Sequence, residues 1–314
     1  MNPFESDPNG VVPPRDFGKF LTEQRNPRTM QLDAVPLREA LRIINDEDAK
    51  VASVVAGEID RIAAAIELIV ARRKRDGHIY FVGAGTSGRL GVIEAAEQTP
   101  TLDVPDPIYQ AIVAGGPECV FRSSEGAEDV SEDGATEVRA RNIVERDVVV
   151  GIAASGTTPY VHGALGEARR RGAGRILLVC NLTGVPQDAA DVIIAPLVGP
   201  EVITGATRLR AATACKMVLN MMTIGTMLQT GKIYENLSVD VPKRSDKLVA
   251  RATRIVRTFT DATDAEARRA LEAADFRAKI AIVMIRRKVD RKGAEQILAK
   301  ADGFLRRALE SETT

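Results

Sequence analysis

The sequence predicts a doubly wound α/β fold, in which helices cover both faces of a parallel sheet. Short apolar runs rich in Val and Ile alternate with helical stretches; the runs are residues 78–82, 109–114, 147–153, 175–180 and 191–197. The runs lack polar alternation, as is typical of parallel strands that are buried on both faces. Strands that alternate with helices along the chain predict βαβ units and hence a parallel sheet.

The regions that flank these strands divide the chain into three parts. Prolines among polar residues predict an extended arm over residues 1–34, and a partner subunit is one surface on which such an arm can order. Residues 35–242 form the α/β domain. It begins with two expected helices between Leu37 and Lys74, which break near Asp46–Asp48. Amphipathic patterns without strand signals predict a helical domain over residues 243–314.

Within the α/β part, residues 206–229 predict a long helix with apolar residues on all sides. Such a helix is buried in a core or at a subunit interface.

Composition excludes several classes of partner. The chain has 43 basic and 43 acidic residues and 45% hydrophobic residues, which is typical of a soluble globular protein and argues against nucleic acid as a ligand. Apolar runs such as residues 193–198 are too short to span a bilayer, and the first residues lack a signal pattern. We therefore expect no membrane contact and a cytoplasmic location.

The cysteines and histidines are few. Cys119, Cys180 and Cys215 are far apart without metal-type spacing, and we expect them to be small apolar fillers in a reducing compartment. His78 and His162 are too few for a multi-histidine metal cage. The sequence therefore predicts no metal and no other cofactor, and leaves acid–base chemistry to carboxylates.

A glycine-rich loop follows the first expected strand. Gly83, Gly85 and Gly88 match the dinucleotide fingerprint G-x-G-x-x-G. The second strand ends in small residues and offers no acidic side chain for a ribose hydroxyl, which weakens that interpretation. Thr86 and Ser87 place hydroxyls in the loop, and a single phosphate at a helix N-terminus fits these groups better.

A second loop of this kind follows the third expected strand. Ser155, Gly156, Thr157 and Thr158 precede Pro159, which fits the first position of a helix. A lone Ser/Thr loop is usually only a helix cap. Two such loops at neighbouring strand ends can converge on one anion, so we expect a sugar phosphate there.

Several motifs together resemble the N-acetylmuramic acid 6-phosphate etherase family over residues 18–312. They are GAGTSGRLGVIEAAE, SSEGAED, DVVVGIAASGTTPYV, VGPEVITGATRLRAATACKMVLNM and GKIYENLSVDV. The resemblance implies a sugar isomerase (SIS) domain followed by a small helical domain similar to ubiquitin-associated folds. It also implies a cofactor-free lyase that forms N-acetylglucosamine 6-phosphate and D-lactate, and a homodimer with sites near the subunit interface.

By this resemblance the two catalytic carboxylates are Glu97 and Glu128. Ether cleavage needs a base to remove the C2 proton, acidified by the C1 aldehyde, and an acid to protonate the departing lactate oxygen. One carboxyl must be protonated and the other ionised at the working pH. We assign Glu97 as the acid and Glu128 as the base. The choice of these two residues is better supported than the assignment of a role to each. The alternative is that both are ordinary solvated glutamates.

A helix that starts at Ser87 would place Glu97 about 15 Å along its axis, too far for a sugar held at the helix end. Either that helix starts late or breaks, or Glu97 serves the site of a partner subunit.

Some positions depart from the family pattern. Thr157 replaces an arginine of the family, Gln98 and Thr99 replace a Cys-Pro pair, and Ala206, Arg210 and Ala212 replace Ser, Lys and Gly. These departures concern substrate identity and efficiency more than fold. The main alternative function is a non-catalytic sugar-phosphate regulator that resembles glucokinase regulatory protein, which has a duplicated SIS unit where this chain has one. An isomerase is a weaker alternative.

Overall fold

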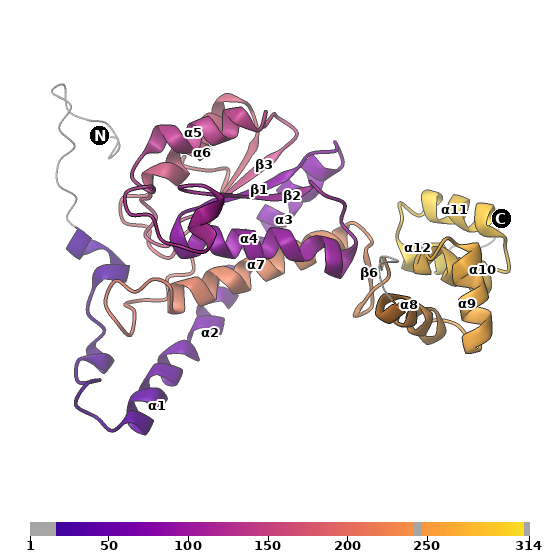
Figure 1. The fold of residues 1–314 in the computed structure, drawn as a ribbon, viewed down its shortest axis with the longest axis horizontal. Helices are drawn as coiled ribbons and strands as arrows, with labels where there is room; N and C mark the ends of the chain where they lie inside the picture. Colours follow the sequence, from indigo (N-terminus) through magenta and orange to yellow (C-terminus); the bar gives the residue numbers. More distant parts are fainter. Residues whose placement is uncertain (1–16, 241–245, 311–314) are drawn as a thin grey trace. The chain divides into compact units, whose positions relative to one another are not determined.

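A computed structural model describes residues 17–240 and 246–310 of the chain (Figure 1). Two compact units make up the structure. The first consists of Met1–Ala95 and Pro107–Thr223, and the second of Ala96–Asp106 and Ile224–Thr314.

The first unit is built on a five-stranded parallel sheet with the order β2-β1-β3-β4-β5. The strands are β1 (Ile79–Gly83), β2 (Tyr109–Val113), β3 (Val148–Ile152), β4 (Gly174–Leu178) and β5 (Val192–Ile194). The predicted fold class is confirmed, and each expected apolar run forms a strand. Because the strand order reverses between β1 and β3, the carboxyl ends of these two strands mark the position where such sheets bind ligands.

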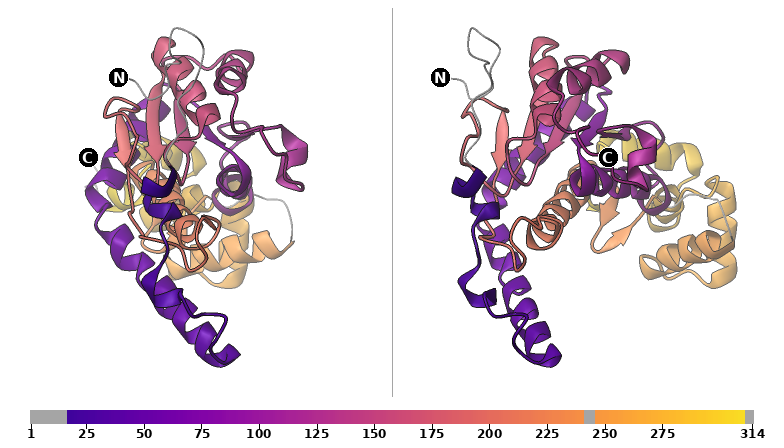
Figure 2. Two further views of the ribbon diagram at one scale, coloured as in Figure 1. Left: turned by 90° about the vertical axis from the view of Figure 1, so that its left-hand side faces the viewer. Right: turned by 60° about the vertical axis from the view of Figure 1, so that its left-hand side comes forward.

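Helices cover both faces of this sheet, as Figures 1 and 2 show. On one face α6 (Pro159–Arg170) contacts β1, β3 and β4, and α5 (Ser131–Ala140) packs on α6. On the other face lie α3 (Ile59–Arg73), which contacts β4 and β5, and α4 (Gly85–Leu102). Residues from β1 and β3 are therefore buried throughout, which explains their lack of polar alternation.

The contact between α5 and α6 depends on two glycines. A Cβ on Gly134 would lie 1.9 Å from the carbonyl oxygen of Tyr160, and one on Gly163 would lie 1.8 Å from that of Ser131. No larger residue fits at these distances. The first turn of α5 is thereby held against the first turn of α6.

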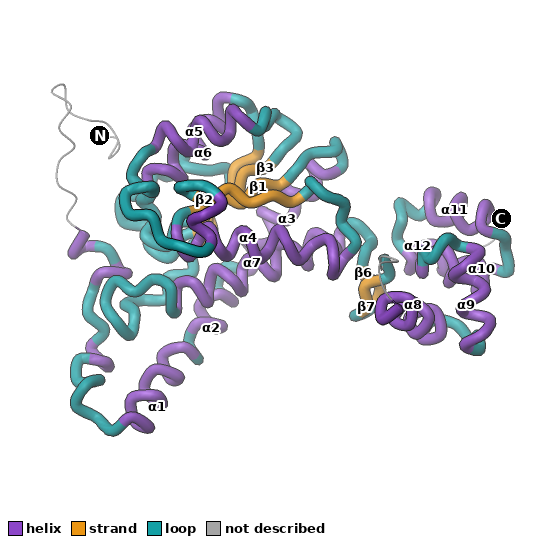
Figure 3. Tube along the Cα trace, viewed as in Figure 1, coloured by secondary structure: helices purple, strands orange, loops and turns teal. Residues whose placement is uncertain are grey.

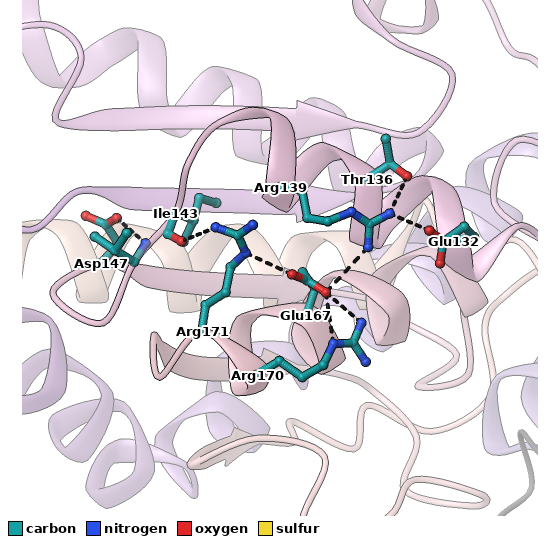
Figure 4. Close-up of polar contacts among 9 residues, drawn as sticks. Glu132, Thr136, Arg139, Ile143, Asp147, Glu167, Arg170 and Arg171 are labelled. Carbon is teal, nitrogen blue, oxygen red and sulfur yellow. Dashed lines mark hydrogen bonds and ion pairs between the residues drawn. The ribbon is translucent and has the colours of Figure 1, made fainter.

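A buried glutamate anchors the other end of the same helix pair (Figure 4). Glu167 in α6 accepts hydrogen bonds from Arg171 at 2.8 Å and from Arg170 at 2.6 Å, and Arg139 of α5 lies 3.4 Å away. Hydrogen bonds from Arg171 and Arg170 hold the pKa of Glu167 below its usual value. Several cations around one buried carboxylate satisfy the rule that buried charges are paired.

The N-terminal segment differs from the expected extended arm where it is described. It contains the short 3-10 helices Phe17–Lys19, Leu21–Glu23 and Pro27–Thr29, and it packs on the chain's own loops. A buried carboxylate, Glu47, holds the third of these helices in place: it accepts a hydrogen bond from Asn26 and pairs with Arg28 and Arg210. Residues 1–16 of the expected arm lie outside the described residues.

Three helical segments follow instead of two. They are α1 (Leu37–Asp48), α2 (Val51–Ala56) and α3, so one break comes slightly later than expected and a second break divides the next helix at residues 57–58. In both views of Figure 2, α1 and α2 project away from the sheet.

The long apolar helix is α7 (Arg210–Gln229), which starts four residues later than expected. Among the described residues it has the length and composition of a membrane-spanning helix, with a mean hydropathy of 1.2. Half of that stretch is buried within the protein, and core helices of water-soluble proteins meet the same criterion.

The second unit contains a helical bundle and a short antiparallel pair of strands that the sequence did not reveal (Figure 3). The strands are β6 (Ile233–Tyr234) and β7 (Leu237–Ser238), and the helices are α8 (Asp246–Thr258), α9 (Asp264–Ala273), α10 (Ala278–Arg287), α11 (Arg291–Lys300) and α12 (Leu305–Glu310). Ile280, Ile282 and Val283 of α10 are fully buried in the bundle core. The expected buried stripe on this segment is therefore confirmed.

We predict that Gly163→Ala destabilises the protein by about 1 to 3 kcal/mol or more, because the new methyl group overlaps backbone that cannot move away. Gly166→Ala is the matched control on the same helix, since its Cβ would meet no atom within 4 Å. The control should leave stability unchanged or raise it by up to about 1 kcal/mol. Urea unfolding of the two variants decides the matter, and equal stabilities would contradict the close helix contact.

Candidate active site

The first candidate turn joins β1 to α4. Gly85, with φ +53°, begins the helix, and Thr86 and Ser87 lie half-buried in its first turn. The first N–H groups of a helix have no partner within the helix and can bind an anion. The other two glycines have a packing role: a Cβ on Gly83 would lie 2.7 Å from the nitrogen of Gly88, and one on Gly88 would lie 2.9 Å from Val113. Strand–helix packing therefore explains the glycine spacing without a dinucleotide.

The second candidate turn joins β3 to α6. Pro159 is the first residue of α6, as expected from the sequence. Ser155 and Thr158 are half-buried, whereas Gly156 and Thr157 are buried. Gly156 has φ +78°, a conformation that favours glycine.

The two turns begin at the same height along the neighbouring strands β1 and β3. Gly83 is paired with Ile152 in the register of β1 and β3, so both turns begin directly after paired positions. Thr86, Ser87, Ser155 and Thr158 therefore follow adjacent strand ends at the same sheet edge.

Glu128 lies beside the second turn through its backbone. Its carbonyl oxygen accepts a hydrogen bond of 3.1 Å from the N–H of Tyr160, in the first turn of α6. The Glu128 side chain is exposed and lies on the segment that leads into α5. The glycine contact between α5 and α6 therefore also sets the position of this candidate base.

A third connection holds the segment that precedes Glu128. Arg89 of α4 donates hydrogen bonds of 2.8 Å to the carbonyl of Val120 and 2.9 Å to that of Cys119. The guanidinium of Arg89 thus supports the loop after β2, which agrees with a structural role.

Glu97 lies farther along α4. The helix is continuous from Gly85 to Leu102, and Glu97 is exposed. The expectation that this helix starts late or breaks is therefore wrong, and a regular helix places Glu97 about 15 Å from Ser87 along the axis. Glu97 therefore lies outside the reach of a sugar held at the start of α4.

The buried carboxylate on this helix is Glu94, which the sequence analysis missed. It accepts hydrogen bonds from Lys216 at 2.7 Å and from Thr223 at 2.6 Å, both on α7. The EAAE motif offers two glutamates on neighbouring positions of one helix face, and only the packing of α7 distinguishes them. The spacing of Lys216 and Thr223 could have indicated that both bind the same group, because residues seven apart share one face of a helix.

The positions that depart from the family pattern are mostly internal. Arg210 is 3% exposed and binds the carbonyl of Pro200 and the carboxylate of Glu47. Thr99 is buried and donates to the carbonyl of Val104. Arg210 and Thr99 therefore have structural partners within the chain.

The cysteines are buried, as predicted. The neighbouring thiol of Cys215, 3.9 Å away, together with burial raises the pKa of Cys180. Within residues 17–240 and 246–310, no group of three or more His, Cys, Asp or Glu side chains could hold a metal ion.

Comparison with known proteins agrees with this arrangement. Residues 61–169 match the family model described as the glucokinase regulatory protein N-terminal SIS domain. The fold is also similar to that of a phosphoheptose isomerase from Neisseria gonorrhoeae, with a TM-score of 0.44 and 18% identity over 61% of this chain and 99% of that one. The family match assigns residues 61–169 to a sugar isomerase (SIS) domain.

Full-length relatives are more specific. An N-acetylmuramic acid 6-phosphate etherase from Mesorhizobium japonicum is 45% identical over 94% of this chain and 96% of its own length. One from Clostridium beijerinckii is 44% identical over 92% and 95%. The chain therefore belongs to the N-acetylmuramic acid 6-phosphate etherase family.

We predict that Ser155→Ala weakens binding of a sugar phosphate by about 1 to 3 kcal/mol, the range for a lost hydrogen bond to a charged group. Thr136→Ala, which removes an exposed hydroxyl on α5, is the control and should bind normally. Calorimetric titration with N-acetylglucosamine 6-phosphate gives both affinities. Equal affinity of the Ser155 variant and the wild type would place the phosphate elsewhere.

Proposed function

We propose that this protein cleaves the D-lactyl ether of N-acetylmuramic acid 6-phosphate, with N-acetylglucosamine 6-phosphate and D-lactate as products. The observation that carries the proposal is the similarity to etherases over nearly the whole chain. The two hydroxyl-bearing turns at the β1/β3 edge support a sugar phosphate as substrate. In this proposal Thr86, Ser87, Ser155, Gly156, Thr157 and Thr158 bind the phosphate.

The proposed reaction is an elimination followed by hydration, and it makes the protein a carbon–oxygen lyase. Glu128 removes the C2 proton of the open-chain sugar, and the C1 aldehyde takes up the negative charge as an enolate. The electrons return as the bond between C3 and the lactyl oxygen breaks, and Glu97 gives its proton to the departing lactate. Water then adds its hydroxyl to C3 and a proton to C2, which restores the saturated sugar.

We propose that a second copy of the chain completes the site. Glu97 is exposed and far along α4 from the phosphate-binding turns. Large apolar side chains are also exposed in the N-terminal part of the first unit: Met30, Leu37, Leu41 and Ile59. Apolar exposure of this kind marks protein interfaces. A homodimer would cover such residues and could bring Glu97 of one subunit to the site of the other.

We also propose a cytoplasmic location, which the three buried free thiols and the proposed sugar phosphate substrate support. A non-catalytic sugar-phosphate regulator is the second candidate, because the family model that matches residues 61–169 is that of a regulatory protein. A regulator has no use for an acid and a base, so turnover separates the two functions.

We predict that the purified protein releases lactate from N-acetylmuramic acid 6-phosphate, and that Glu128→Gln abolishes both lactate release and exchange of the C2 proton with deuterated water. Glu97→Gln should stop lactate release and leave some C2 exchange, because enolate formation needs only the base and the carbonyl. Each loss should be about 10² to 10⁴ in rate. Lactate is measured enzymatically and exchange by proton NMR.

Glu125→Gln is the control, since Glu125 is an exposed glutamate three residues before Glu128 in the same segment. It should retain activity. Exchange that persists in the Glu128 variant and vanishes in the Glu97 variant would reverse the roles. Near-normal lactate release from either variant would exclude the two-carboxylate mechanism, and tight sugar-phosphate binding without any lactate would favour the regulator.

A further inference from the structure

Two side chains hold the turn at residues 153–158 by hydrogen bonds to two consecutive backbone carbonyl groups. The side-chain amide of Asn181 donates to the carbonyl of Ser155 at 2.9 Å. The Nε2 atom of His162 lies 2.7 Å from the carbonyl oxygen of Gly156. A carbonyl can only accept a hydrogen bond, so the imidazole must carry its proton on Nε2 in this contact.

These two bonds fix the direction of the N–H groups that follow. In a trans peptide the carbonyl and the next N–H point in opposite directions. The N–H of Gly156 accordingly turns inward to the carbonyl of Ala153, at 2.8 Å. The N–H of Thr157 points away from His162 toward the hydroxyl of Ser155.

The contact between Thr157 and Ser155 is weak. The nitrogen of Thr157 lies 3.4 Å from Oγ of Ser155, which is longer than an ordinary hydrogen bond. A phosphate oxygen at this point can take the Thr157 N–H and the Ser155 O–H in place of that contact. The turn thus presents one backbone donor and one hydroxyl donor side by side.

Asn181 also connects this turn to distant parts of the chain. Its Oδ1 accepts a hydrogen bond of 3.2 Å from the N–H of Leu21, and its amide also donates to the carbonyl of Thr183 at 3.1 Å. The residue is 1% exposed. One buried side chain therefore joins the N-terminal segment, the loop after β4 and the 153–158 turn.

The space around Gly156 shows how closely the turn is enclosed. A Cβ at this position would lie 2.6 Å from the side chain of Val185 and 2.7 Å from the carbonyl oxygen of Asn181. The turn therefore cannot move toward Val185 and Asn181.

We propose that His162 and Asn181 are positioning residues, which hold the 153–158 turn in the shape that its phosphate ligand requires. The inference rests on the proposed function, in which this turn binds the phosphate of the substrate. Neither side chain needs to touch the substrate. Their effect should therefore fall on phosphate binding and KM, and much less on kcat.

The test compares His162→Leu, which removes the donor, with His162→Gln, whose side-chain amide can donate at a similar reach. Inorganic phosphate is titrated into each full-length variant by calorimetry. His162→Leu should weaken binding about tenfold, the effect of one lost hydrogen bond, and His162→Gln should stay within about twofold of the wild type. The KM for the etherase substrate should follow the same pattern, with kcat nearly constant.

A second pair of variants tests Asn181 without altering it. Leu21→Pro removes the N–H that donates a hydrogen bond to Oδ1 of Asn181. The backbone of Phe20 (φ −76°, ψ 136°) already has the conformation required before a proline. Arg25→Pro is the control, because Gln24 before it (φ −73°, ψ 150°) is equally extended. Leu21→Pro should weaken phosphate binding about threefold, a smaller loss than that of a hydrogen bond made directly to the turn. Arg25→Pro should leave phosphate binding unchanged.

Phosphate binding that is unchanged in both His162→Leu and Leu21→Pro would overturn the inference, and so would equal losses in His162→Leu and His162→Gln, which would indicate ring packing. If His162→Leu does not fold, the proline pair alone decides. Failure of the proposed function is a separate result: a protein that shows the predicted phosphate pattern but releases no lactate supports the positioning roles and contradicts the etherase.

Discussion

The parallel register of β1 and β3 is the constraint on which the candidate site depends. Because Gly83 pairs with Ile152, the turns that carry Thr86 and Ser87 and then Ser155 and Thr158 start level with each other. A shift of one residue would turn the side chains of one strand to the opposite face and displace its turn. Continuous burial of both strands makes such a shift unfavourable, so the core of the sheet fixes the spacing of the ligand-binding turns.

Close packing and buried charges position the helices and the N-terminal segment around the sheet. Gly134 and Gly163 let α5 approach α6 so closely that the backbone of Glu128 reaches the second turn. Glu167 binds the arginines at the far end of this helix pair, and Glu47 binds the N-terminal segment in a similar way. Each of these carboxylates is nearly enclosed, and removal of one partner would leave a buried charge uncompensated.

Much of the fold could be predicted from the sequence, because strands buried on both faces leave a simple apolar pattern. The helix start at Pro159 and the two hydroxyl-bearing turns could be predicted as well, since proline fixes φ at a helix start and glycine permits the positive φ of a turn. The short strands β6 and β7 were missed because two-residue strands have no periodicity to detect. The 3-10 helix after Asn26 was missed because Asn26 and Arg28 bind Glu47, which is distant in the sequence.

The site was less predictable than the fold for a related reason. The sequence places Glu94 and Glu97 three positions apart and cannot say which of them α7 covers. His162 directly follows the motif DVVVGIAASGTTPYV, but nothing in the sequence indicates that its side chain reaches the carbonyl of Gly156, six residues earlier. Long-range contacts such as those of Glu94 with α7 have no local signal. They come from packing, which overrides local preferences.

We propose that the turns after β1 and β3 bind one phosphate group together. A crystal structure of the full-length Glu128→Gln variant with N-acetylglucosamine 6-phosphate tests it most directly. Phosphate oxygens should lie within hydrogen-bond distance of both Ser87 and Ser155. A phosphate that contacts only one of the two turns, or neither, would contradict it.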